Sequence, residues 1–201
     1  MQKLCLTLLC CFLLGTDASA EDKHRAVGAH VHGHGSLNIA IEGNTVTMEL
    51  EAPGADIVGF EHAAKTDAQK AALKTAKEAL ESPLKLFVFS PEAGCSQKTA
   101  KVMLETEHEA KESEHAHEHE KKSGKHAKDK ASEESEGTHA EFHAEYQLSC
   151  KTPKALTSIT FAYFDQFKGA EELDVNVITA KGQRQYEVER DEPRIALQGM
   201  M

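Results

Sequence analysis

Alternating histidines carry the chemistry that this sequence offers. They form three groups: His30, His32 and His34; His139 and His143, which alternate with Glu141 and Glu145; and His115, His117 and His119. Imidazole is the commonest protein ligand for mid-to-late transition metals. The spacing therefore indicates metal binding, with solvent-exposed strand faces and a solvated charge run as the simpler interpretation of each group.

The first group precedes a sequence that predicts a β-hairpin. Apolar residues alternate on either side of a Gly43-Asn44 turn, which is a strong hairpin signal. Pairing across this turn gathers the apolar side chains on one face, as a half-buried hairpin requires. The predicted pairs are Ile41 with Val46, Ile39 with Met48, and Leu37 with Leu50. If the first strand extends back to His30, its histidines lie on the opposite, solvent-exposed face.

The same register opposes His34 and Pro53, so the segment after Pro53 should leave the hairpin close to the histidines. Two imidazoles two residues apart on a strand can converge on one metal ion, whereas three do so less easily. We therefore expect two ligands from the first group and at least one from elsewhere. The candidates are Glu61, His62, His139 and His143. Imidazole with carboxylate suits Zn²⁺, but Cu²⁺ and Ni²⁺ would also bind such a set.

Residues 1–20 contain Lys3, an apolar run and a final Ala-Ser-Ala, which predict a secretory signal cut after Ala20. The apolar run is too short to span a membrane. The mature chain keeps Cys95 and Cys150. In an exported protein this pair is most simply a disulfide, with a cysteine metal-ligand pair as the alternative.

Residues 107–137 consist mainly of acidic residues, lysines and histidines, with alanine as the sole apolar type. Such a composition cannot bury enough surface to fold alone, so it predicts a disordered insertion. Its histidines, His115, His117 and His119, would capture metal weakly. The remainder, from residue 21 to residue 201, predicts a single antiparallel-rich α+β domain with one main helix over 66–81. A central covered strand is predicted over 84–89, and further strands over 101–106, 138–150, 156–162, 173–180, 185–190 and 194–197.

Composition and motifs narrow the function classes. A formal net charge of -10 argues against a nucleic-acid partner. The sequence has no HExxH, no GxSxG, no phosphate-cradling glycine loop and no dinucleotide fingerprint. We therefore expect a metal-binding protein rather than an enzyme, although a metal-dependent hydrolase with dispersed ligands stays an alternative.

The order of these features resembles a known family. His30-Val31-His32-Gly33-His34, the hairpin, Gly59-Phe60-Glu61-His62, the helix, Cys95, the histidine-rich insertion and the strand ending at Cys150 are similar to the ZrgA-type zinc-regulated proteins of Gram-negative bacteria. The resemblance implies periplasmic zinc binding, in zinc acquisition or buffering alongside a membrane transporter or its binding component. It also implies a metal role for His30, His32 and His62. A metal-tolerance protein that sequesters excess zinc or copper is the alternative.

Overall fold

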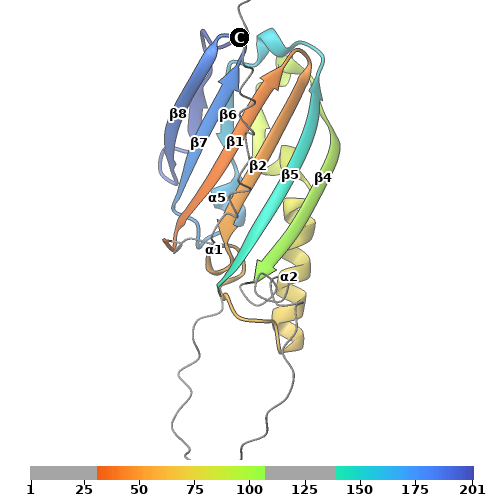
Figure 1. The fold of residues 1–201 in the computed structure, drawn as a ribbon, viewed down its shortest axis with the longest axis vertical. Coiled ribbons are helices and arrows are strands. Elements are labelled where there is room, and N and C mark those ends of the chain that lie inside the picture. Colours follow the sequence, from red (N-terminus) through yellow and green to blue (C-terminus); the bar gives the residue numbers. More distant parts are fainter. Residues whose placement is uncertain (1–30, 107–138) are drawn as a thin grey trace, which may run out of the picture.

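The computed structural model describes residues 31–106 and 139–201, and these residues form two sheets with helices packed between and beside them. The larger sheet has six strands in the order β4-β5-β2-β1-β7-β8, and the smaller has three in the order β3-β6-β9. In Figure 1 the larger sheet lies in front, while the smaller sheet and the helices cover its rear face. This confirms the predicted α+β class.

The large sheet is antiparallel except for one parallel pair, β1 with β7. Its strands are β1 (His34–Glu42), β2 (Thr45–Pro53), β4 (Cys95–Thr106), β5 (Ala140–Cys150), β7 (Glu172–Thr179) and β8 (Gly182–Glu189). The small sheet contains β3 (Phe87–Phe89), β6 (Ser158–Phe161) and β9 (Arg194–Ala196). The helices are α1 (Gly54–Val58), α2 (Asp67–Leu80), α3 (Pro83–Leu86) and α5 (Tyr163–Gln166), with short 3-10 turns at Pro91–Ala93 and Pro153–Ala155.

The predicted hairpin is confirmed, register included: Ile41 pairs with Val46, Ile39 with Met48, and Leu37 with Leu50. These apolar side chains are all buried on the rear face of the sheet. The strand predicted over 138–150 is confirmed as β5, and every second side chain along it is buried: Ala140, Phe142, Ala144, Tyr146, Leu148 and Cys150. The front face of the large sheet is consequently polar.

The main helix is α2, which confirms the helix predicted over residues 66–81, and it begins with a capping box. The Thr66 side chain accepts a hydrogen bond from the backbone N–H of Gln69, whose side chain accepts from the backbone N–H of Thr66. The apolar side of α2 places Ala76 and Leu80 in the core. Phe161, Phe164 and Phe167 are also buried.

Two sequence-based predictions about strands were wrong. Residues 84–89 do not form a central strand of the large sheet, because the helical turn α3 takes up Pro83–Leu86 and leaves only Phe87–Phe89 for β3 in the small sheet. The first strand begins at His34, because Gly33 adopts a left-handed conformation (φ 88°) that breaks the extended chain. His32 therefore lies in a turn rather than on a strand face.

The predicted disulfide between Cys95 and Cys150 is confirmed. These two residues pair directly across β4 and β5, and the same ladder ends with Thr106 opposite Ala140. The disulfide therefore closes one end of this strand pair. The opposite end opens onto residues 107–138, which lie outside the described residues together with residues 1–30.

Candidate metal centre

The Glu61 carboxylate lies between two imidazoles from distant parts of the chain. Its Oε1 is 3.2 Å from Nε2 of His32, and its Oε2 is 3.0 Å from Nδ1 of His139. The Glu61 side chain is only 14% exposed, whereas those of His32 and His139 are 66% and 41% exposed. The carboxylate is therefore held by the fold, while the two imidazoles are open to solvent.

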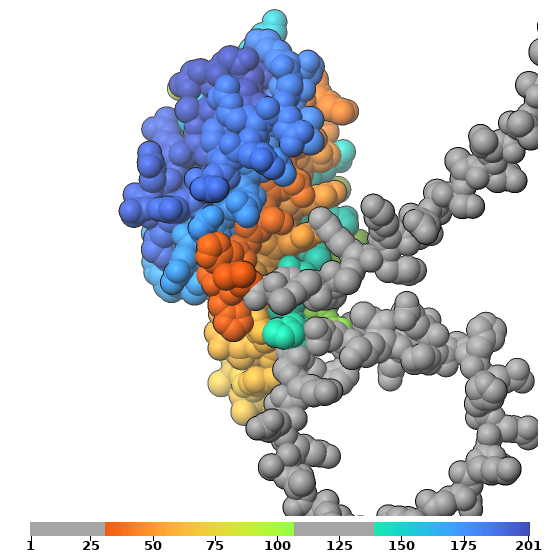
Figure 2. Space-filling model, turned by 60° about the vertical axis from the view of Figure 1, so that its left-hand side comes forward, coloured from red at the N-terminus to blue at the C-terminus, as the bar shows by residue number. Residues whose placement is uncertain are grey.

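Three separate elements bring these side chains together. His32 precedes β1, His139 precedes β5, and Glu61 follows α1. The helix α1 ends at Gly59, whose left-handed conformation (φ 82°) redirects the chain toward Glu61. Figure 2 shows the corresponding orange, yellow and green-blue segments meeting at the lower end of the described surface.

Two imidazoles and one carboxylate are a ligand set that suits Zn²⁺. In this structure each imidazole contacts an oxygen of the Glu61 carboxylate, and the three side chains do not surround a common position that a metal ion could occupy. Within residues 31–106 and 139–201, no group of three or more His, Cys, Asp or Glu side chains is already placed to hold a metal ion. Metal binding would exchange the imidazole–carboxylate contacts for metal–ligand bonds.

His34 contacts a different carboxylate. Its Nδ1 is 3.4 Å from Oε2 of Glu172 on the neighbouring strand β7. Gly33 lies between His32 and His34 and turns the chain through its left-handed conformation, and the two histidines contact different carboxylates. The structure thus brings His32, rather than His34, to Glu61.

His143 lies in a carboxylate-rich cluster on the front face of the sheet. Its Nε2 is 2.9 Å from Glu141 on the same strand and 3.6 Å from Glu105 on β4. The hydrogen bond with Glu141 and the nearby Glu105 and Glu51 carboxylates raise the pKa of His143, although partial burial opposes them. This cluster favours the protonated imidazole.

His62 is exposed and takes a third direction. Its ring stacks on Phe60 with centroids 5.1 Å apart, and its Nδ1 lies 3.0 Å from the Ala63 carbonyl oxygen. Its Nε2 is 3.4 Å from the Gln69 amide nitrogen. These contacts hold His62 against Phe60 and beside the first turn of α2.

Most of this sequence matches a known protein family. It matches the family model described as ZrgA family zinc uptake protein over residues 29–197. The chain belongs to the ZrgA family. No curated protein matches the sequence. Membership places this ZrgA-family chain among zinc uptake proteins, and the matched range contains every ligand candidate named above.

Several predicted ligands of this ZrgA-family chain lie outside the described residues. These are His30, His115, His117 and His119. Their metal roles stay predictions, as do those of His32, His34, Glu61, His62, His139 and His143. No helix in the described part of the chain has the length and apolar character needed to cross a membrane.

Sequence reasoning missed Asp56, Glu105 and Glu172. Asp56 is 4% exposed and its Oδ1 accepts a hydrogen bond from the Gly33 backbone at 2.8 Å. Burial raises the pKa of Asp56, while this hydrogen bond and the neighbouring His32 and His34 lower it. Only the predicted closeness of the segment after Pro53 to the histidines could have drawn attention to it.

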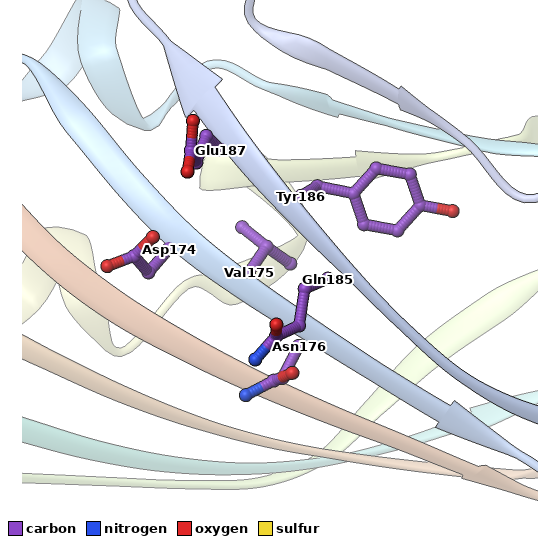
Figure 3. Close-up of a pocket in the computed structure, with 6 residues that line it drawn as sticks. All are labelled: Asp174, Val175, Asn176, Gln185, Tyr186 and Glu187. Atoms are coloured by element: carbon purple, nitrogen blue, oxygen red, sulfur yellow. The ribbon is translucent and has the colours of Figure 1, made fainter.

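A shallow polar hollow lies elsewhere on the front face, between β7 and β8 (Figure 3). Asp174, Asn176, Gln185 and Glu187 line it with Val175 and Tyr186. The Tyr186 ring points to the other side of β8, where its hydroxyl donates to the Ala196 carbonyl. None of the predicted metal ligands lines this hollow.

Proposed function

We propose that this protein binds Zn²⁺ in the periplasm at His32, Glu61 and His139 and contributes to zinc acquisition or buffering, delivering the ion to a membrane transporter system. The observation that carries the proposal is the nearly buried Glu61 carboxylate, which faces one imidazole with each oxygen. Membership of a zinc uptake family supports zinc as the cargo.

The geometry suits capture and release rather than permanent retention. Glu61 supplies a fixed negative charge, whereas the exposed imidazoles of His32 and His139 can turn toward an incoming ion. Zinc sites in proteins usually have four ligands. We assign His30 first to the remaining position because it lies two residues before His32, with His34, His62 and His143 as further candidates.

We further propose that His115, His117 and His119 collect zinc weakly and pass it to this site. The segment that carries them starts after Thr106 and returns at His139, one of the three proposed ligands. Thr106 pairs with Ala140, so both ends of the segment lie at the end of β5 that carries the site.

A periplasmic location is supported by the signal predicted over residues 1–20 and by the disulfide. Disulfides persist in oxidising compartments such as the periplasm. Transcription separates acquisition from metal tolerance: zinc starvation should induce a protein of zinc acquisition, whereas zinc excess should induce one that sequesters the metal.

Calorimetric titration of the mature chain with zinc tests the proposal. We expect more than one bound Zn²⁺, with the tightest site kept when residues 107–137 are replaced by a short Gly/Ser linker. His139→Ala should weaken that tightest site. Loss of all binding in the linker variant, or unchanged binding in His139→Ala, would contradict the proposed site. Copper and nickel titrations of the same proteins establish the metal preference.

A further inference from the structure

Asp56 is a buried carboxylate that the proposed zinc site does not use as a ligand. It sits within α1, and its Oδ1 accepts the hydrogen bond from the Gly33 backbone at 2.8 Å. Its Oδ2 has no hydrogen-bond partner among the described residues. An ionisable side chain with 4% exposure is costly to bury unless it is paired, and the Asp56 side chain makes only one hydrogen bond with the described residues.

The bonded residue, Gly33, separates His32 from His34, and its peptide is held from both sides. The backbone N–H groups of Glu171 and Glu172 both donate to the Gly33 carbonyl, at 2.8 and 2.9 Å. Asp56 holds the Gly33 N–H in turn. The left-handed conformation of Gly33 is thereby fixed, and with it the direction in which His32 leaves the turn.

The same carboxylate is tied to the segment that carries Glu61. Asp56 precedes Glu61 by five residues, across the left-handed cap at Gly59. The backbone of Asp56 packs closely on Gly169, where an added Cβ would come within 2.7 Å of the Asp56 Cα and carbonyl oxygen. The Arg190 guanidinium donates to the carbonyls of Phe164, Phe167, Lys168 and Ala170, which fixes the loop around Gly169.

We propose that Asp56 is the positioning residue of the zinc site: its hydrogen bond to Gly33 joins the turn of His32 to the segment of Glu61 and sets the distance between these two ligands. The inference rests on the proposed function. Removing groups that orient metal ligands typically costs about 10–100-fold in metal affinity. Loss of this hydrogen bond should have an effect of that size, although Asp56 touches no metal.

The test compares two substitutions at the same position. Asp56→Ala removes the acceptor, whereas Asp56→Asn keeps an oxygen that can accept the Gly33 N–H. Because Oδ2 makes no hydrogen bond with the described residues, replacing it with an amide nitrogen removes none. We expect Asp56→Ala to weaken zinc binding at least tenfold and to change the visible spectrum of the Co²⁺-loaded protein. Asp56→Asn should stay within about threefold of wild type, with the wild-type spectrum.

Two controls separate positioning from general stability. Asp165→Ala removes an exposed carboxylate from another short helix, α5, and should bind zinc normally. Ile41→Ala opens the core beside the Gly43 turn and should lower the melting temperature without changing zinc affinity. Exchange of the Gly33 amide, followed by NMR in the metal-free protein, should accelerate in Asp56→Ala only.

Each contrary outcome has a separate meaning. Wild-type affinity in Asp56→Ala, equal weakening in Asp56→Asn, or equal weakening in Ile41→Ala would overturn the positioning role. If Asp56→Ala fails to fold, Gly169→Ala decides, because the added Cβ displaces the Asp56 backbone, and the carboxylate with it, without removing the acceptor from the chain. Unchanged affinity in Gly169→Ala overturns the inference. Unchanged affinity in Glu61→Gln would show instead that the proposed site itself is wrong, and the inference would fall with it.

Discussion

Replacing Glu61 by glutamine is the sharpest perturbation of the proposed site. The change keeps the shape of the side chain and one acceptor oxygen but removes the negative charge between His32 and His139. Because the Glu61 side chain is only 14% exposed, water cannot fully replace the negative charge that the substitution removes. The fold should survive because both neighbouring imidazoles are partly exposed and can reach solvent.

The expected loss follows from the charges involved. Two unit charges 4 Å apart attract by about 4 kcal/mol at an effective dielectric constant of about 20. For a divalent ion the gross attraction to Glu61 doubles to about 8 kcal/mol. Zinc must displace the hydrogen bond between Glu61 and His139 and the 3.2 Å contact between Glu61 and His32, and we take about 1.5–3 kcal/mol for each, as for hydrogen bonds to charged groups. Subtracting these two contacts leaves about 2–5 kcal/mol, which corresponds to a rise in Kd of roughly 30- to 5,000-fold.

The assay is a competition titration of the metal-free protein against a chromophoric zinc chelator at fixed pH and salt. The matched control is Glu145→Gln, which makes the same chemical change on β5 at a carboxylate that is 57% exposed and paired with Lys101. We expect the control to remain within about threefold of wild type. Binding by Glu61→Gln within that same range, or equal losses in both variants, would refute the assignment of Glu61 as a ligand.

Three further outcomes are expected. His143→Gln should flatten the pH dependence of the free energy of unfolding of the metal-free protein, which urea titrations at several pH values will measure. Because the pKa of His143 is raised in the folded state, His143 stabilises the fold fully at pH values below its unfolded pKa near 6.5. This contribution disappears as the pH rises through the folded-state pKa. Replacing Cys95 and Cys150 by serine should lower the free energy of unfolding by about 4 kcal/mol in the chain-entropy model, which denaturant unfolding will measure. Zinc affinity, measured by titration, should not change because the disulfide lies at the opposite end of β5 from the site. Changing His30 and His32 together to alanine should weaken the tightest zinc site by more than about tenfold while circular dichroism stays that of wild type; loss of folding would show that these side chains support the core.

Local patterns were sufficient for much of the fold. The Gly43-Asn44 turn and the flanking alternation determine the hairpin register, and the Thr66–Gln69 capping box determines where α2 begins. These features depend on residues close together in sequence. The register also predicted that the segment after Pro53 returns to the histidines, which is how Glu61 became a candidate.

The remaining features depend on long-range pairing that periodicity does not encode. Glu172 reaches His34 only because β7 pairs in parallel with β1, and Glu105 reaches His143 only because β4 pairs with β5. The three-residue strand β3 is too short to be recognised as such, and its partner β6 comes about 70 residues later. Asp56 gives no local sign of burial, because its environment is created by Gly33 and Gly169.

The disulfide has a consequence for how the protein withstands proteases. Residues 107–138 separate β4 from β5, and Cys95 on β4 is bonded to Cys150 on β5. A single peptide-bond cleavage anywhere between Thr106 and His139 would therefore leave two fragments that stay covalently joined and paired along the whole ladder. The nicked protein would migrate as one chain until a reductant is added. His139 and Glu61 would then sit on different fragments, yet the sheet and the covalent bond would still hold them together.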